Sequence, residues 1–278
     1  MNKIAVRDFN LNMTLLGGQS FCWDYDGSYF YGFTSARIIK LKQGMDYWHW
    51  QTYPVLNDIK FIKEYFRLHV KYNKIISVIS KDKYVNRGIQ QYPGLRLLKQ
   101  PFCDTVISFI ISANNNIKAI RKSIRILSRM YGKRIKVDDK YFYLFPKIDK
   151  LANARLSGLK NSRIGFRAKY VKNAARCLVA SGLEKRIDKM SENQIRTELI
   201  NLPGVGDKVA DCTLCYGVAL DDVMPLDVWG RRILSTYYGL SPKLSYNAMR
   251  VCTKTHFGGY AAWAGQFLFE YIRHNFRK

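Results

Sequence analysis

The segment with the clearest chemical meaning is a glycine-containing turn that leads directly into a lysine. It spans residues 202–208, with the sequence LPGVGDK, and lies between two helical patterns. Gly204 and Gly206 permit a tight turn and leave backbone N–H groups bare at the start of the next helix. Bare amides at the positive end of a helix dipole bind anions. The turn therefore indicates a phosphate contact that would hold DNA without reading its sequence; an ordinary interhelical turn is the alternative.

Lys208 lies in the first turn of the following helix, where a cation opposes the helix dipole. The positive field there, together with the many other cations of the chain, should favour the neutral amine. A neutral amine is a nucleophile that can attack a sugar carbon and form a Schiff base. A lysine that only binds phosphate is the alternative for this position taken alone.

Asp227 is the second candidate for chemistry. It follows Pro225-Leu226 and directly precedes another helical pattern, so its structural interpretation is an N-cap. A carboxylate at that helix end can also face Lys208 across a cleft and stabilise a cationic sugar in the transition state. The two residues together argue against a DNA-binding module without chemistry.

The charge of the chain points to a polyanionic partner. Its 278 residues include 46 Lys and Arg against 21 Asp and Glu, a formal net charge of +25. Such an excess repels itself in the compact state, so nucleic acid is the first candidate partner and an anionic membrane surface the second. A Lys-rich proteome is the alternative explanation. Hydrophobic residues at 47% and charged residues at 24% are typical of globular proteins, which excludes disordered and collagen-like chains.

The chain shows no sign of secretion or of a membrane span. The longest apolar runs, such as residues 106–111, are far shorter than the ~20 residues that a span needs, and residues 1–8 lack an apolar signal core. Six cysteines scattered over this length do not indicate the disulfide framework of a small secreted domain, so we expect reduced thiols inside a cell. For the pair Cys212-x-x-Cys215, buried thiols are preferred over zinc or a redox pair, because no second pair stands at metal spacing.

The elements that must position these residues are of two kinds. Between residues 21 and 53, aromatic and β-branched residues alternate with turn signals, and Asp26-Gly27 separates two such runs, which is the signal of a hairpin. Further strands are predicted at 36–42 and 46–51, and helices at 58–70 and 72–79. After residue 94 the strand signals largely stop, and helices are predicted over 104–113, 117–131, 148–154, 167–181, 192–202, 208–220, 228–238, 245–257 and 261–274.

This order of elements predicts an α+β fold. An N-terminal antiparallel β-sheet module with helices is followed by a larger all-α region. We place the two domains at residues 1–93 and 94–278, so that the turn, Lys208 and Asp227 all belong to the helical region and its cleft. We expect the protein to be a monomer.

The turn resembles that of the helix-hairpin-helix DNA glycosylases, the HhH-GPD superfamily. The match comprises LPGVG, then Lys208 followed by VADC, and then Asp227. Within that superfamily the chain is similar to the 8-oxoguanine DNA glycosylase/AP lyases, because five more blocks occur in the family's order. These blocks are GQSFCW at 18–23, GLRLLKQ at 94–100, NNNI at 114–117, GFRAKY at 165–170 and YAAWA at 260–264. The resemblance implies a TBP-like N-terminal sheet module and a helical glycosylase region.

The resemblance also implies a bifunctional enzyme of base excision repair. Such an enzyme flips 8-oxoguanine out of duplex DNA, removes it through a Schiff base and cuts the strand by β-elimination. The implied partner is double-stranded DNA that contains oxidised guanine, and not a membrane. The implied location is intracellular, in the cytoplasm or nucleoid of a prokaryote and in the nucleus otherwise. The alternatives are a lyase-competent glycosylase for another damaged base and a non-catalytic helix-hairpin-helix DNA-binding protein.

Position by position, the resemblance implies roles for individual residues. Lys208 would be the nucleophile and Schiff-base residue, and Asp227 would assist it electrostatically. The backbone carbonyl of Gly18 would accept a hydrogen bond from the N7 hydrogen that oxidised guanine has and guanine lacks. Cys212 and Phe269 would contact the two faces of the base. Asn114 and Arg167 would contact the cytosine left unpaired when the lesion flips out, and Phe166 would insert into the duplex. The other residues implied to contact DNA are Gly204, Gly206, Val209 and Trp229.

No cofactor is implied for the reaction. The backbone carbonyls of the hairpin would instead hold a structural monovalent or calcium ion, and the residues that carry them are Ile200, Leu202 and Val205.

Three positions depart from the family's pattern. Gly265 stands where the family often has a Gln on the Watson–Crick edge of the base, with Gln266 one residue away. Trp229 stands where a His often lies near a phosphate, and Ala119 where an Arg often contacts the opposite cytosine. We therefore expect a weakened preference for cytosine opposite the lesion. The four-cysteine iron–sulfur loop of endonuclease III and the adenine glycosylases is missing after the helical core, which weighs against those relatives.

Overall fold

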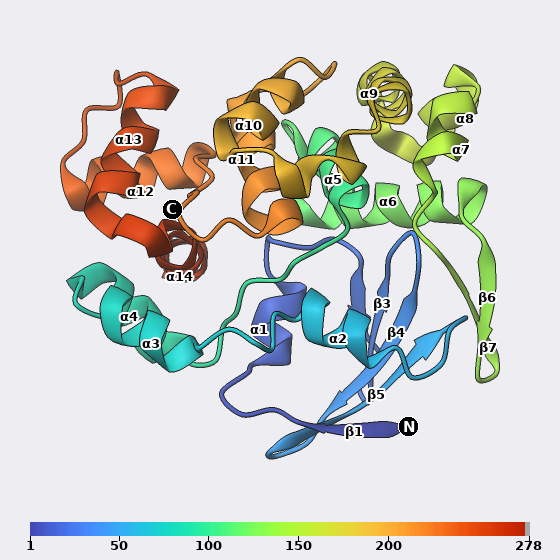
Figure 1. Ribbon diagram of the computed structural model, residues 1–278, viewed down its shortest axis with the longest axis horizontal. Helices are drawn as coiled ribbons and strands as arrows, with labels where there is room; N and C mark the ends of the chain where they lie inside the picture. Colours follow the sequence, from blue (N-terminus) through green and yellow to red (C-terminus); the bar gives the residue numbers. More distant parts are fainter. Residues whose placement is uncertain (276–278) are drawn as a thin grey trace.

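The fold is α+β, as the sequence predicts. The computed structural model describes residues 1–275, in which an antiparallel sheet of five strands lies beside a larger body of helices (Figure 1). Across the sheet the strand order is β1-β5-β4-β3-β2. The strands are β1 (Asn2–Ala5), β2 (Trp23–Tyr25), β3 (Phe30–Phe33), β4 (Ile38–Gln43) and β5 (Tyr47–Tyr53).

The β2–β3 hairpin forms at the predicted turn. Gly27 has a φ of 98°, a conformation that favours glycine, and the Asp26 carboxylate accepts a hydrogen bond from the backbone N–H of Tyr29 at 2.9 Å. In the resulting register Trp23 pairs with Gly32. A Cβ at Gly32 would lie 2.5 Å from the indole of Trp23, so the glycine makes room for that ring.

The sheet packs its apolar face against two short helices, α1 (Leu11–Leu16) and α2 (Ile59–Tyr65), and so forms a core of its own. Aromatic rings fill this core: Phe9 and Phe66 both meet Trp48 edge to face, with ring centroids 4.6 and 5.0 Å away. Helix α2 ends five residues earlier than the predicted 58–70. The chain turns at Arg67, whose φ of 52° is left-handed and cannot continue a helix.

The helical body contains the second core. Its elements from α5 to α13 are α5 (Phe102–Ser112), α6 (Ile117–Tyr131), α7 (Ile148–Asn153), α8 (Leu156–Leu159), α9 (Arg167–Ser181), α10 (Glu192–Ile200), α11 (Asp207–Thr213), α12 (Val228–Tyr238) and α13 (Tyr246–Phe257). Helices α3 (Tyr72–Ile79) and α4 (Lys83–Gln91) pack against the last helix, α14 (Ala261–Asn275), beside which they lie in Figure 1. Residues 72–91 therefore share a core with the last helix of the chain. The domain division between residues 93 and 94 stays a prediction.

Helix α5 is the centre of the helical body. All of its residues are buried, and it packs against α6, α9 and α11. Its C-terminal end therefore holds a fixed position relative to the start of α11, which carries Lys208. Within residues 1–275, no helix has the length and apolar character that crossing a membrane requires.

One hairpin in the helical region was not predicted. Strands β6 (Arg134–Val137) and β7 (Lys140–Tyr143) form a separate two-stranded sheet that extends toward the larger one (Figure 1). Phe142 stacks on Tyr31 of β3 with ring centroids 4.8 Å apart. Each strand has only four residues, which is too short for an alternation of apolar and polar residues to stand out in the sequence.

Candidate active site

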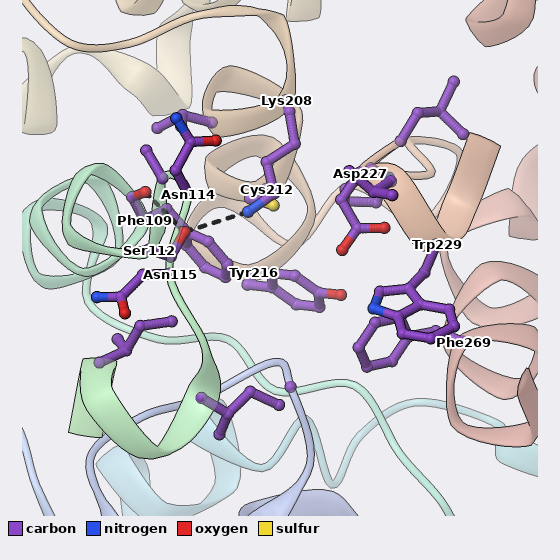
Figure 2. Close-up of a pocket in the computed structure, with 18 of the residues that line it drawn as sticks. Phe109, Ser112, Asn114, Asn115, Lys208, Cys212, Tyr216, Asp227, Trp229 and Phe269 are labelled. Carbon is purple, nitrogen blue, oxygen red and sulfur yellow. Dashed lines mark hydrogen bonds between the residues drawn. The ribbon is translucent and has the colours of Figure 1, made fainter. Parts of the chain in front are cut away.

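A cavity of about 870 Å³ lies where six segments of the chain meet (Figure 2). The segments are the turn before β2, the loop between α5 and α6, the start of α11, the start of α12, the start of α13 and the middle of α14. Most of the predicted site residues line this cavity, namely Gly18, Asn114, Gly204, Gly206, Lys208, Val209, Cys212, Asp227, Trp229 and Phe269.

The hairpin before Lys208 has the tight geometry expected from its glycines. After α10 the chain turns through a hydrogen bond from Val205 N–H to the Leu202 carbonyl, 3.1 Å long. Gly204 has a φ of 83°, and a Cβ there would lie 2.6 Å from Cβ of Tyr170. Gly206 is the N-cap of α11 and supplies no side chain to cap it. The first N–H groups of α11 are therefore left without a side-chain cap at the edge of the cavity.

Lys208 extends from α11 into the cavity. Its side chain is half-buried, and Nζ donates to Oγ of Ser112 at 3.2 Å. The amine also lies 4.8 Å from the ring centroid of Phe109, one turn earlier in α5. Because a hydroxyl and a ring face hold the amine, it is oriented without a strong ion pair that a nucleophile would first have to break.

Asp227 enters the cavity from the opposite side (Figure 2). The structure confirms its N-cap interpretation, since Oδ1 accepts from the backbone N–H of Gly230 at 2.8 Å. Capping uses one lone pair of a carboxylate that has about four. The same side chain can therefore terminate α12 and present negative charge to the cavity that contains Lys208.

A hydrogen-bond relay ties the segment before Asp227 to the helix of Lys208. Tyr246 donates its hydroxyl hydrogen to Asp211 of α11 at 2.9 Å and accepts the backbone N–H of Leu226 at 3.2 Å. Asp211 has no exposed side-chain surface, and Arg196 pairs with it at 3.1 Å. Burial raises the pKa of Asp211 to about 6, and the guanidinium of Arg196 opposes that rise. Asp211, to which the sequence assigned no role, thus contributes to the spacing of the two catalytic candidates.

Cys212 lies one helical turn beyond Lys208, at the back of the cavity (Figure 2). It is 2% exposed, and burial raises the pKa of its thiol to about 12, with the charge of Lys208 opposing the rise. The residue therefore offers a neutral, polarisable surface. Cys212 and Cys215 are both free thiols, and among residues 1–275 no group of three or more His, Cys, Asp or Glu could hold a metal ion.

Two glycines shape the far wall of the cavity. A Cβ at Gly18 would lie 2.7 Å from the ring of Phe269, so only glycine allows this turn to approach α14 so closely. A Cβ at Gly265 would lie 2.6 Å from Cγ of Met224, a residue only 2% exposed. Met224 therefore fills the space in which a longer side chain at 265 would stand.

Gln266 is buried on the same wall and already has partners. Its Oε1 accepts from the hydroxyl of Tyr216 at 2.9 Å, and its Nε2 donates to Oε1 of Glu270 at 3.4 Å. The side chain lines the cavity, as Tyr216 does. It can contact a ligand only with the hydrogen-bonding capacity that these partners leave.

Phe166 and Arg167 lie outside the set of residues that line the cavity. Phe166 is 62% exposed, at the start of α9. Arg167 is 8% exposed, and its guanidinium donates to the backbone carbonyls of Ala113 and Asn114. Asn114 is exposed, with a left-handed φ of 49°. Arg167 thus braces the loop that presents Asn114, and the roles of all three residues toward DNA stay predictions.

Several cavity residues had no signal in the sequence. Ser112, Phe109, Tyr216, Met224 and Tyr246 all line the cavity. In the sequence the first four residues have the pattern of ordinary buried positions in helices or loops. Tyr246 stands at the start of a predicted helix and has no feature that marks it. Their importance arises only from tertiary packing, which brings the end of α5, the segment after α11, the loop before α12 and the start of α13 to one cavity.

The chain matches two protein-family models. Residues 107–254 match the family model described as HhH-GPD superfamily base excision DNA repair protein. The chain belongs to the HhH-GPD superfamily. Residues 2–106 match the model described as 8-oxoguanine DNA glycosylase, N-terminal domain, so the sheet and the helical body both have counterparts in known proteins.

Individual HhH-GPD relatives extend this match over most of the chain. A probable N-glycosylase/DNA lyase of Methanothermobacter thermautotrophicus is 30% identical over 216 residues, which cover 69% of this chain and 68% of that protein. The N-glycosylase/DNA lyase of Saccharomyces cerevisiae is 31% identical over 247 residues, covering 75% of this chain and 65% of the yeast protein. A solved structure of the Clostridium acetobutylicum 8-oxoguanine glycosylase/lyase, in complex with double-stranded DNA containing cytosine opposite 8-oxoguanine, is 28% identical with a TM-score of 0.89, over 99% of this chain and 98% of that one.

Proposed function

We propose that the protein is a bifunctional DNA glycosylase and AP lyase that excises 8-oxoguanine from duplex DNA in base excision repair. The observation that carries the proposal is the placement of Lys208 and Asp227 on opposite sides of one cavity, directly after the hairpin of an HhH-GPD chain. The relatives include N-glycosylase/DNA lyases and an 8-oxoguanine glycosylase/lyase, which supports both the lyase reaction and 8-oxoguanine as the excised base.

The lesion must leave the helix before it can react. C1′ of a stacked nucleotide cannot be attacked inside the duplex, so the nucleotide is flipped outward. The cavity of about 870 Å³ is within the size range of small-molecule sites and has its polar groups on its walls. The flipped base occupies its depth, and the sugar lies between Lys208 and Asp227.

The chemistry then follows from these two side chains. The amine of Lys208 attacks C1′, and the new C–N bond forms as the bond from C1′ to the base breaks. The base leaves with that electron pair and takes up the proton that the attached nitrogen releases. The carboxylate of Asp227 stabilises the positive charge that develops on the sugar. Opening of the sugar ring gives a Schiff base on Lys208. Loss of the C2′ proton and cleavage of the C3′–O bond complete β-elimination.

The base is selected by groups around the cavity. The backbone carbonyl of Gly18 accepts the N7 hydrogen that distinguishes oxidised guanine from guanine. Cys212 and Phe269 contact the two faces of the ring. The burial of Cys212 and the close packing of Phe269 on Gly18 support this arrangement.

The remaining contacts hold the DNA. The hairpin residues Gly204 and Gly206 bind a phosphate through backbone N–H groups, and the net charge of +25 supports binding along the duplex. Other residues that we propose to touch DNA are Asn114, Phe166, Arg167, Val209 and Trp229. We propose that the protein acts as a monomer and in the compartment that holds the cell's DNA.

A structural cation at the hairpin is a further part of the proposal. The carbonyls of Ile200, Leu202 and Val205 are hard oxygen ligands of the type that monovalent and calcium ions prefer. Helix α10 ends at Ile200, where carbonyls lack partners further along the helix. Leu202 O accepts only the Val205 N–H among the backbone bonds described, which leaves a second lone pair.

Borohydride trapping tests the proposed function. Duplexes that carry 8-oxoguanine, another damaged base or a preformed abasic site are incubated with the wild type, with Lys208→Gln and with Lys63→Gln, an exposed lysine of α2 as a matched control. We expect the wild type and the control to be trapped on the 8-oxoguanine and abasic duplexes, and Lys208→Gln to bind DNA without trapping.

The other outcomes contradict separate parts of the proposal. Trapping of Lys208→Gln would refute Lys208 as the nucleophile. If the wild type were trapped on abasic DNA or on another lesion but not on the 8-oxoguanine duplex, 8-oxoguanine would be refuted as its substrate. Binding without trapping and without release of free base on any duplex would reduce the protein to a non-catalytic DNA-binding module.

A further inference from the structure

Glu270 is a buried carboxylate beside the cavity that the proposed reaction does not use. It follows Phe269 in α14 and has no exposed surface. Buried charges are tolerated when they are paired and hydrogen-bonded. Arg273 supplies the pairing, since its Nη2 lies 2.6 Å from Oε2 of Glu270. The guanidinium of Arg273 also lies 5.8 Å from the ring centroid of Phe269.

The second oxygen of Glu270 contacts the wall of the cavity. Oε1 accepts hydrogen bonds from the backbone N–H of Gly18 and from Nε2 of Gln266, each at 3.4 Å. Gly18 and Gln266 line the cavity, whereas Glu270 is not among its lining residues. The carboxylate therefore acts on the cavity through the groups that it holds.

Gly17 shows how tightly this turn sits against the carboxylate. A Cβ at Gly17 would lie 2.6 Å from Oε1 of Glu270 and 2.9 Å from the carbonyl of Met13. The φ of Gly17 is −72°, which any residue can adopt. Space, and not backbone conformation, therefore explains the glycine at this position.

The chain on the other side of Gly18 is anchored as well. Gln19 is buried; its Nε2 donates to the carbonyl of Arg96 at 2.7 Å, and its Oε1 accepts from Leu98 N–H at 3.0 Å. Gly18 is thus held between Glu270 before it and Gln19 after it. These two anchors determine the direction in which its carbonyl points.

We propose that Glu270 is a positioning residue for recognition of the oxidised base, because it fixes the Gly17–Gly18 turn against α14. The inference rests on the proposed function, in which the Gly18 carbonyl accepts the N7 hydrogen. Without the carboxylate, the turn loses its contact to α14, and the carbonyl loses its fixed distance from the base. β-Elimination at an abasic site involves no base to recognise and therefore does not depend on this contact.

The test compares two reactions of the same protein. Single-turnover excision of 8-oxoguanine depends on base recognition, and cleavage of a preformed abasic site does not. For Glu270→Leu we expect excision to fall at least about tenfold, since small displacements of positioning groups have effects of this size, while abasic-site cleavage changes less than about twofold. Gly17→Ala disturbs the same contact from the side of the turn, so it should also lower the excision rate and leave the rate of abasic-site cleavage nearly unchanged. Glu270→Gln keeps an acceptor oxygen and should recover part of the excision rate.

The control is Asp104→Leu, which removes another buried carboxylate outside the cavity and should leave the ratio of the two rates unchanged. Rates are expressed per active site, counted by borohydride trapping on abasic DNA, so partial unfolding does not imitate the effect. An equal fall of both rates in Glu270→Leu, or no fall in either, would overturn the inference. Failure of the wild type to excise 8-oxoguanine would overturn the proposed function instead.

Discussion

The contact between Gly265 and Met224 can be tested by a double-mutant cycle. A Cβ at 265 would lie 2.6 Å from Cγ of Met224, whereas ordinary contacts of a Cβ begin at 3.4 Å. Met224 is 2% exposed and is packed against α14. Overpacking of this kind costs about 1–3 kcal/mol. Gly265→Ala should therefore lower the free energy of unfolding by about that amount, less the roughly 1 kcal/mol that alanine gains over glycine inside a helix.

Removing the obstructing side chain should reverse this cost. Met224→Ala alone leaves a cavity and should lower the free energy of unfolding by about 2–5 kcal/mol. In the double variant the new methyl group enters the space that Met224 has left. The combined loss should then be smaller than the sum of the single losses by roughly 1–3 kcal/mol, the range of coupling found for residues in contact.

The assay is urea denaturation of the wild type, the two single variants and the double variant. Met249 of α13 is buried as well and lies outside the cavity, so Gly265→Ala combined with Met249→Ala is the matched control and should be additive. Additive losses for the Gly265 and Met224 pair would refute the argument that Met224 occupies the space beside Gly265. Excision of 8-oxoguanine should follow the same cycle, since both residues line the cavity.

Three further predictions concern pH, salt and the opposite strand. Burial raises the pKa of Asp104 from 3.8 to about 7, so the folded state retains a proton that the unfolded state releases, and the contribution of Asp104 to stability should fall by about 3–4 kcal/mol as the pH rises from about 4 to 7. Urea denaturation should therefore show the wild type losing about that much stability relative to Asp104→Asn over this pH range. Fluorescence anisotropy should show DNA affinity falling about 10³-fold or more between about 50 and 200 mM salt, and a flat titration would contradict a phosphate-dominated interface. Cleavage opposite each of the four bases should show a preference for cytosine that is weak in the wild type and about tenfold stronger in Ala119→Arg, because a good bidentate contact contributes roughly 1–3 kcal/mol; a strict cytosine requirement in the wild type would contradict this.

The longer helices could be predicted because local signals agree with packing. Helices α6, α9 and α12 occupy the predicted residues 117–131, 167–181 and 228–238. Each combines a helical apolar pattern with a glycine directly after its last residue, at Gly132, Gly182 or Gly239. Local sequence and tertiary structure give the same answer in such segments.

The short elements could not be predicted in the same way. Helix α1 has six residues and strand β1 has four, too few for a period to be visible. The β6–β7 hairpin depends on a ring of another strand, as the stacking of Phe142 on Tyr31 shows. The stabilising partner lies about a hundred residues away, so no local window of the sequence contains the information.

The same distinction applies to the site. Lys208 and Asp227 could be found because each stands in a local pattern, a glycine turn and a helix start, that restricts its position. Ser112, Met224 and Glu270 could not, because each acts across a contact between two helices or between a helix and a turn. A buried serine or glutamate in a helical pattern, or a buried methionine in a loop, has no property in the sequence that reveals which group it will meet.

Both catalytic candidates are held in place by interactions that also stabilise the fold. Asp227 caps α12 through Gly230, so its carboxylate cannot rotate away from the cavity without exposing a helix end. Lys208 contacts Ser112 at the end of α5, a helix that is buried throughout. The two side chains therefore keep their positions before any DNA arrives. Electrostatic catalysis requires such preorganisation, because a charge that must reorient during the reaction contributes less to lowering the barrier. Asn114 and Phe166, which we propose to contact DNA, are exposed at the surface instead.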